Sequence, residues 1–191
     1  MALWLVRAGG HGEFEQKFLN DNRIYLTWDG LNHNLAKLAD KAALLDVLRQ
    51  VYPQFTKNHL YNNRGQVWAF ARRMQPGDWV VCPSKSRPAI AVGEITGPYK
   101  YDGDAKDPYY HSRTVKWLNH EVPRSNFGQD LLYSLGSLLT VCEVSRNDAE
   151  KRVRAMAAGG WKPEPATVAL TIGPEAEEGD AETSADGGVD L

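Results

Sequence analysis

The chain has 191 residues, of which 42% are hydrophobic and 10% aromatic, and its formal net charge is −2. This length fits one domain of ordinary size followed by a tail, with enough chain to bury a core. No apolar run approaches the roughly 20 residues that span a bilayer. The segment Met1–Arg7 also lacks the basic start and long apolar stretch of a signal peptide. We therefore expect a cytoplasmic protein of a microbe.

The charges are unevenly distributed along the chain. From Pro163 onward there are eight acidic residues and no Lys or Arg, whereas residues 1–162 hold the other 16 acidic residues and all 22 basic ones. The sequence thus predicts a folded domain over residues 1–160 and an acidic disordered tail or linker over 161–191. The domain carries a surplus of about six positive charges, which suits a polyanionic partner.

Residue spacing argues against the common catalytic and metal sites. The five histidines show no H-x-x-x-H spacing, and two cysteines, both in apolar runs, are too few for a structural zinc site. Phosphate-loop, zinc-deaminase and nucleophile-elbow patterns are also missing. We expect a protein without a metal or cofactor that is not itself an enzyme. The alternative is a histidine-dependent phosphodiesterase built on His111, Ser112 and Arg113, or on the loop around His11.

The N-terminal part begins with a predicted strand, Leu3–Arg7, a glycine-rich loop and a short helix over Glu13–Asn20. The next strand, Arg23–Trp28, alternates in the two-residue period of a half-buried strand, and the Asp29-Gly30 pair predicts a turn after it. Trp28 then stands at the end of a strand. There it either stacks on a flat ligand, with Asp29 accepting hydrogen bonds from the ligand's edge, or fills the core.

Periodicity predicts the remaining elements in chain order. Expected helices cover Leu31–Leu38, Lys41–Val51, about Arg64–Met74 with its N-cap region at Asn62-Asn63, Asp130–Leu135, and a last helix capped by Asn147. Expected strands cover Trp79–Pro83, Ala89–Ile95, Arg113–Leu118 and Leu138–Val144. These elements predict an α+β fold in which a mixed sheet of five to six strands curls into a small barrel or half-barrel flanked by helices.

The segment Thr96–Ser112 is the longest irregular stretch of the domain and contains four tyrosines. Long loops are often functional, and an aromatic one has rings ready for stacking. A packed lid without a ligand is the alternative.

The order of several short motifs resembles the EVE and YTH branch of PUA-like domains over about residues 3–145. The motifs are Leu-Trp-Leu-Val-Arg, Arg-Ile-Tyr-Leu-Thr-Trp-Asp-Gly, Trp-Ala-Phe-Ala, Met-Gln-Pro-Gly-Asp-Trp-Val-Val, Ala-Val-Gly-Glu-Ile-Thr-Gly, Val-Lys-Trp-Leu and Val-Pro-Arg-Ser. One departure is the segment Leu31–Tyr61, which is longer than in compact members of that branch.

The resemblance implies a reader of modified, for example methylated, bases. Such domains hold a flipped or single-stranded base in an aromatic cage, and related ones precede the nuclease domain of modification-dependent, Mrr-like restriction endonucleases. By position, the cage would use Trp28 and Asp29, Tyr109, Tyr110 or His111 in the long loop, and Arg7, Gly9 and Gly10 after the first strand.

The residues themselves are compatible with such a role. Extruding a base costs a few kcal/mol, and stacking on aromatic rings returns roughly 1–3 kcal/mol per base. Phosphates would be held by basic residues in or beside loops, namely Lys85, Arg87, Arg113 and Arg124. An RNA-binding PUA-like module is an alternative that differs only in its substrate.

Overall fold

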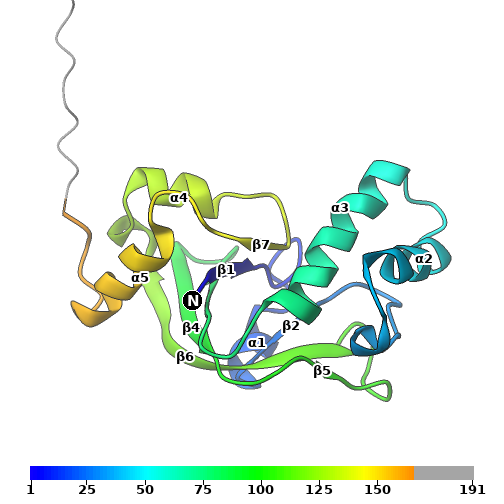
Figure 1. The fold of residues 1–191 in the computed structure, drawn as a ribbon. Coiled ribbons are helices and arrows are strands. Elements are labelled where there is room, and N and C mark those ends of the chain that lie inside the picture. The colour runs from blue at the N-terminus through cyan, green and yellow to red at the C-terminus, as the bar shows by residue number, and fades with distance from the viewer. Residues whose placement is uncertain (166–191) are drawn as a thin grey trace, which may run out of the picture.

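A curled sheet with helices on both faces forms the body of the computed structural model, which describes residues 1–165 (Figure 1). The strand order is β2-β6-β4-β3-β1-β7, and the short β5 also pairs with β6. The strands are β1 (Leu3–Val6), β2 (Arg23–Tyr25), β3 (Trp79–Pro83), β4 (Ala89–Ile95), β5 (Lys100–Tyr101), β6 (His111–Pro123) and β7 (Val141–Glu143). This arrangement confirms the predicted α+β class and curled sheet.

The helices are distributed along the whole chain. They are α1 (Glu15–Asn20), α2 (Lys41–Val51), α3 (Lys57–Trp68), α4 (Gln129–Leu135) and α5 (Ala149–Ala158), with short 3₁₀ turns at Leu35–Lys37 and Arg124–Asn126. None of the described helices is long and apolar enough to cross a membrane.

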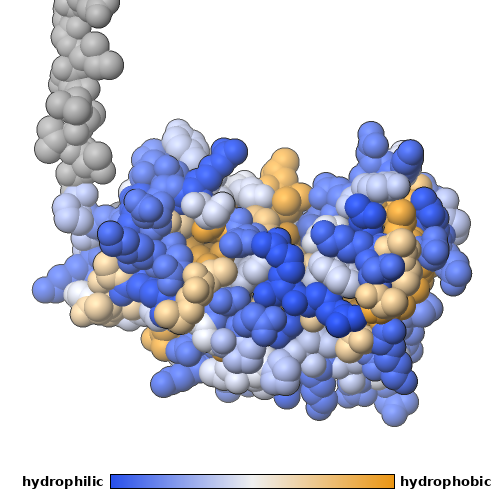
Figure 2. All heavy atoms as spheres, viewed as in Figure 1, coloured by the Kyte–Doolittle hydropathy of each residue, from blue (hydrophilic) through white to orange (hydrophobic). Residues whose placement is uncertain are grey.

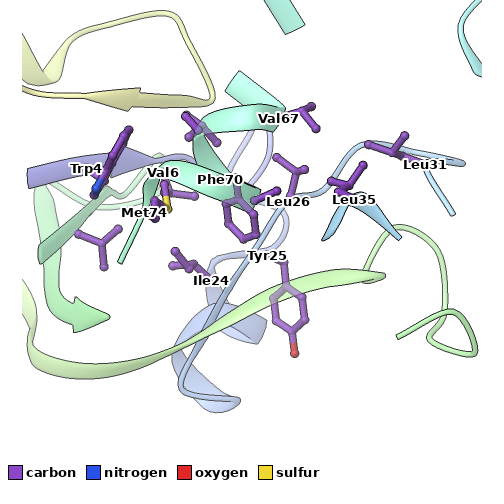
Figure 3. Packing of buried hydrophobic residues seen from close by; sticks show 14 of the residues in the cluster. Trp4, Val6, Ile24, Tyr25, Leu26, Leu31, Leu35, Val67, Phe70 and Met74 are labelled. Atoms are coloured by element: carbon purple, nitrogen blue, oxygen red, sulfur yellow. The ribbon is translucent and has the colours of Figure 1, made fainter. Parts of the chain in front are cut away.

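β1 is buried on both faces because the sheet separates two apolar cores. Trp4 and Val6 face the core formed with α2 and α3, whereas Leu3 and Leu5 face the core formed with α4 and α5. Figure 3 shows the first core, in which Phe70 lies between β1 and β2. The two-residue period of a strand thus explains why β1 is apolar at every position.

The long strand β6 produces the curl. Its first residues pair with β2 and β5, and its later residues pair with β4 through a register containing two irregularities. Gly93 lies at one of them, and a Cβ there would come within 2.5 Å of Val115 Cγ1. A side chain at this position would prevent the close crossing of β4 and β6.

Helix α3 starts seven residues earlier than the sequence predicts. Thr56 is its N-cap, with the hydroxyl accepting a hydrogen bond from the His59 N–H at 3.3 Å. Asn62 and Asn63, expected to cap the helix, instead lie in its middle. Asn is favoured both at caps and in turns, so a pair of Asn residues does not by itself mark the start of a helix.

The C-terminal end of α3 continues as a π-helical turn, Ala69–Arg73. Arg113 lies buried against this turn, donating from Nε to the Phe70 carbonyl at 2.7 Å and from Nη2 to the Ala71 carbonyl at 3.2 Å. Its Nη1 also approaches the Gly97 carbonyl at 3.5 Å. A cation here both satisfies carbonyls left open by the helix end and meets the negative end of the helix dipole.

Other segments also differ from the expected elements. Residues 31–38 form only the short turn Leu35–Lys37, with the Asn34 side chain accepting from the Ala36 N–H. Asn147 does not cap the last helix, because its amide donates to the Asp130 carbonyl and the Ser134 hydroxyl. Both cases show polar side chains bonding to nearby backbone instead of starting a helix.

The folded body extends beyond residue 160, the predicted end of the domain. Glu164 accepts two hydrogen bonds from Arg152, at 2.7 and 2.8 Å, and a third from the Gly128 N–H at 2.6 Å. The first residues of the predicted tail therefore pack on the domain. The rest of the predicted tail, residues 166–191, lies outside the described residues.

We expect Arg113→Met to lower the free energy of unfolding by about 3 kcal/mol, because the buried carbonyls of the π turn would lose their donors. Urea titration measures this loss. The control is Arg124→Met, an exposed arginine just after β6, which should change stability by no more than about 0.5 kcal/mol. Equal losses in the two variants would contradict the role assigned to Arg113.

Candidate functional site

A cleft of about 640 Å³ opens between the loop after β1, the end of the β2 segment, α3 and the loop before β7. Figure 2 shows the surface hollowed between the parts formed by α4 and by α3, with apolar residues exposed at the notch. The segment between α2 and α3 completes the wall. The cleft thus joins segments that are far apart in the sequence.

Aromatic rings line several sides of the cleft. Trp28 packs half-buried against the core and lines the cleft, as does Phe14. From the segment after α2, Tyr52 stacks on Phe55 with centroids 4.9 Å apart, and Phe55 stacks on His59 at 4.0 Å. The Tyr52 hydroxyl donates to the Asp29 carbonyl at 2.8 Å, which connects this stack to the segment after β2 that carries Trp28.

The inner wall of the cleft carries carboxamide side chains from α3. Gln66 is 7% exposed and fully engaged, since its Oε1 accepts from the Thr140 and Val141 N–H groups at 2.9 and 3.0 Å. Asn63 is 5% exposed and lines the cleft, where its amide is not fully enclosed by protein atoms. This amide can therefore exchange hydrogen bonds with solvent or with a ligand in the cleft.

Two carboxylates, Glu13 and Asp29, also line the cleft, and no Lys or Arg does. Glu13 accepts from the His11 N–H at 2.8 Å, and the backbone N–H groups of Glu13 and His11 lower the pKa of its carboxyl. Gly9 makes this contact possible, because it has a φ of +88° and a Cβ there would overlap the Glu13 carboxylate. The charged rim favours ligand edges that donate hydrogen bonds.

Four of the predicted cage residues meet at this cleft, namely Trp28, Asp29, Gly9 and Gly10. Tyr109, Tyr110 and His111 do not line it. Tyr109 lies behind Phe14, with ring centroids 5.7 Å apart and the rings nearly perpendicular. The long loop therefore supports the aromatic wall from outside rather than forming it.

His111 is fully buried and engaged at both ring nitrogens. Nε2 lies 2.7 Å from the Leu31 carbonyl and must donate to it, so Nδ1 accepts from the Tyr99 hydroxyl at 2.7 Å. The Tyr99 oxygen in turn accepts from the Leu35 N–H. This chain of bonds needs a neutral imidazole, and burial lowers the pKa of His111 to about 4.

The predicted phosphate-binding residues fall into two groups. Arg113 is 3% exposed and bonded internally, so it cannot reach a phosphate, and with His111 and Ser112 also buried the expected acid–base site there is not open. Lys85, Arg87 and Arg124 are exposed around the turn between β3 and β4. This turn abuts the glycine loop of the cleft, because a Cβ on Gly12 would lie 3.0 Å from Lys85 Cβ.

Arg7 is half-buried and does not line the cleft. Its Nε donates to the Ser137 carbonyl at 3.0 Å, and its backbone N–H donates to the Thr140 carbonyl at 2.8 Å. Burial lowers the pKa of its guanidinium. Arg7 thus holds the loop before β7, which borders the cleft, rather than contacting a ligand directly.

Sequence reasoning missed the contribution of α3 to the cleft. A signal was present, because polar residues recur at helical spacing on one face, namely His59, Asn62, Asn63 and Gln66. The interpretation of Asn62 and Asn63 as an N-cap hides this polar helix face. Among the described residues, no group of three or more His, Cys, Asp or Glu side chains could hold a metal ion.

We expect stability to fall by about 2 kcal/mol between pH 7 and pH 5. The unfolded chain takes up a proton on His111 below its ordinary pKa of 6.5, whereas the folded protein does not until about pH 4, so acid favours unfolding. Denaturant titrations across this range measure the change. His111→Gln should flatten the slope, and His11→Gln, which changes an exposed histidine, should retain it. Parallel slopes in all three proteins would contradict the neutral buried imidazole.

Comparisons with known proteins identify the family of this chain. Searches of curated proteins and of solved structures gave no match. A family model described as "Domain of unknown function (DUF8426)" matches residues 4–134, which include β1 to β6 and most of the cleft. The chain therefore belongs to the DUF8426 family.

Proposed function

We propose that this chain is a DNA-binding reader domain that takes a modified, for example methylated, base out of the duplex and into the cleft. The sequence resemblance to EVE and YTH domains and the curled α+β sheet support a PUA-like fold for this task. On this proposal the domain supplies specificity to a modification-dependent restriction system, in which a covalently linked nuclease domain would cut the DNA.

The observation that carries the proposal is the amide of Asn63, which lines the cleft beside aromatic rings. A carboxamide both donates and accepts, and it matches the paired donor and acceptor on the edge of a nucleobase. A hydrogen bond from this amide to a ligand edge would replace one to water, with a net gain of about 0.5–1.5 kcal/mol. The site therefore suits a flat ligand with polar edges.

Stacking provides the second part of the binding energy. Trp28 forms no aromatic pair among the described residues, and it lines the cleft. A base stacked on it would gain roughly 1–3 kcal/mol, which offsets the few kcal/mol needed for extrusion. The carboxylates of Asp29 and Glu13 would accept from an exocyclic amine, as acidic side chains do with cytosine N4.

Phosphates would lie outside the cleft, which contains no Lys or Arg. Lys85, Arg87 and Arg124 are exposed beside the glycine loop and are placed to contact the backbone of a strand whose base enters the cleft. The Arg87 side chain pairs with Glu121, so Lys85 and Arg124 are the freer cations. Such contacts would position the DNA and add affinity that falls with salt.

The proposal is tested by titrating the protein with oligonucleotides that are identical except for one base, carrying 5-methylcytosine, 5-hydroxymethylcytosine or N6-methyladenine in turn. One modified DNA should bind more tightly than its unmodified form. Trp28→Ala should weaken that binding by roughly 1–3 kcal/mol, the scale of one lost stack. The control is Trp68→Ala, which removes another half-buried tryptophan that does not line the cleft.

Affinity is compared per folded molecule by measuring melting on the same samples. Equal binding of modified and unmodified DNA would contradict the reader function. Tighter binding of the matching RNA in direct competition would point instead to an RNA-binding PUA-like module.

A second prediction concerns Asn63→Leu, which keeps the volume of the side chain and removes its polar atoms. Because the amide faces the cleft, stability should stay constant or rise, while affinity for the modified DNA should fall by about 1–3 kcal/mol. Gln66→Leu is the matched control on the same helix face. It should lower stability, since the Thr140 and Val141 N–H groups would lose their acceptor. Unchanged affinity in Asn63→Leu would contradict base recognition by this amide.

A further inference from the structure

Leu138 projects from the loop between α4 and β7 at the edge of the cleft. It is 97% exposed, the highest value among the large hydrophobic side chains of residues 1–165, and it lines the cleft together with Leu139 and Thr140. Figure 2 shows apolar residues exposed at the notch between the α4 and α3 parts of the surface. A single exposed leucine is ordinary by itself, so the argument depends on how the loop is held.

Hydrogen bonds hold the loop on both sides of Leu138. On one side, the Arg7 guanidinium donates to the carbonyls of Leu135 and Ser137, and the Ser137 hydroxyl accepts from the Leu139 N–H at 3.2 Å. On the other side, the Thr140 carbonyl accepts from the Arg7 N–H at 2.8 Å.

The same loop is attached to the inner wall of the cleft. The Thr140 N–H donates to Gln66 Oε1, which also receives the next N–H along the chain. Gln66 lies on α3 one turn after Asn63, so the projecting leucine and the cleft-lining amide belong to one connected framework. The chain therefore uses a half-buried arginine and a buried glutamine to present an apolar side chain to solvent.

We propose that Leu138 is a wedge that enters the base stack of duplex DNA at the position left by the extruded base. This inference rests on the proposed function and extends it, because it makes duplex DNA, rather than a single strand, the substrate of the site. Apolar side chains inserted between base steps compensate for lost stacking, and a loop that is already ordered loses little entropy on insertion. Leu138 meets both requirements beside the cleft that would receive the base.

A different role, docking of another protein, would be expected to involve a broader apolar surface. The other strongly exposed apolar residue of this region is Tyr133 on α4, which lines a separate hollow with Cys142 and Arg146 rather than the cleft. Tyr133 therefore provides a control with similar exposure in the same region.

The test uses the modified DNA that wild-type protein binds most tightly among the three named above, as a duplex and as the same strand unpaired. A 2-aminopurine next to the modified base reports its unstacking by fluorescence. Leu138→Ala should weaken duplex binding about tenfold and reduce the fluorescence change, while single-strand binding should stay within about twofold. Leu138→Met should retain most of the duplex affinity, and Tyr133→Ala should behave as wild type.

The outcomes separate the two proposals. If wild-type protein binds both forms and Leu138→Ala loses nothing on the duplex, or loses equally on both forms, the wedge is overturned and the reader function stands. If wild-type protein prefers none of the modified DNAs in either form, the reader function fails and the wedge fails with it. Because Leu138 is almost fully exposed, its replacement leaves the fold intact, which melting confirms.

Discussion

Two side chains at the start of β6 donate buried hydrogen bonds to backbone carbonyls outside regular helices and strands. The rest of the structure depends on these hydrogen bonds. His111 and Arg113 are two residues apart and point to the same face of the strand. His111 donates to the Leu31 carbonyl, and Arg113 donates to the carbonyls of the π turn that ends α3. Both groups satisfy backbone that no regular element would satisfy, and both hold the helical layer in place over the sheet.

Arg113 is held without a carboxylate in direct contact. Burial lowers the pKa of its guanidinium to about 10, so it stays charged at neutral pH, and the nearby Asp78 partly offsets this effect. Asp78 is itself buried, and it accepts from the Trp4 indole N–H and from the Ala2 and Gln75 N–H groups. The position of α3, and with it the inner wall of the cleft, thus depends on two charged groups that the apolar pattern of the sequence does not reveal.

Features that depend on local interactions could be predicted from the sequence, whereas features that depend on contacts between distant segments could not. The strands Trp79–Pro83 and Ala89–Ile95 were predicted with their observed bounds because apolar runs and turn residues are local signals. Trp28 does line the cleft, but the predicted strand is too long, because β2 ends at Tyr25 and Trp28 lies three residues beyond it. Its partners could not be found in this way, because Phe55 lies between α2 and α3 and Asn63 lies within α3, and the position of this region is fixed by contacts with distant strands. The aromatic loop was misleading, since stacking rings serve equally well as packing behind a wall.

The position of β1 between β3 and β7 has a consequence for how the chain folds as it is made. β1 pairs in parallel with β3 and antiparallel with β7, so its partners lie about 75 and 140 residues further along the chain. At synthesis rates of roughly 5–20 residues per second, the apolar residues of β1 wait several seconds for the first partner and longer for the second. During that time a strand apolar on both faces is open to wrong pairing. Nascent chains of this protein should therefore be clients of chaperones that bind short apolar segments near the ribosome.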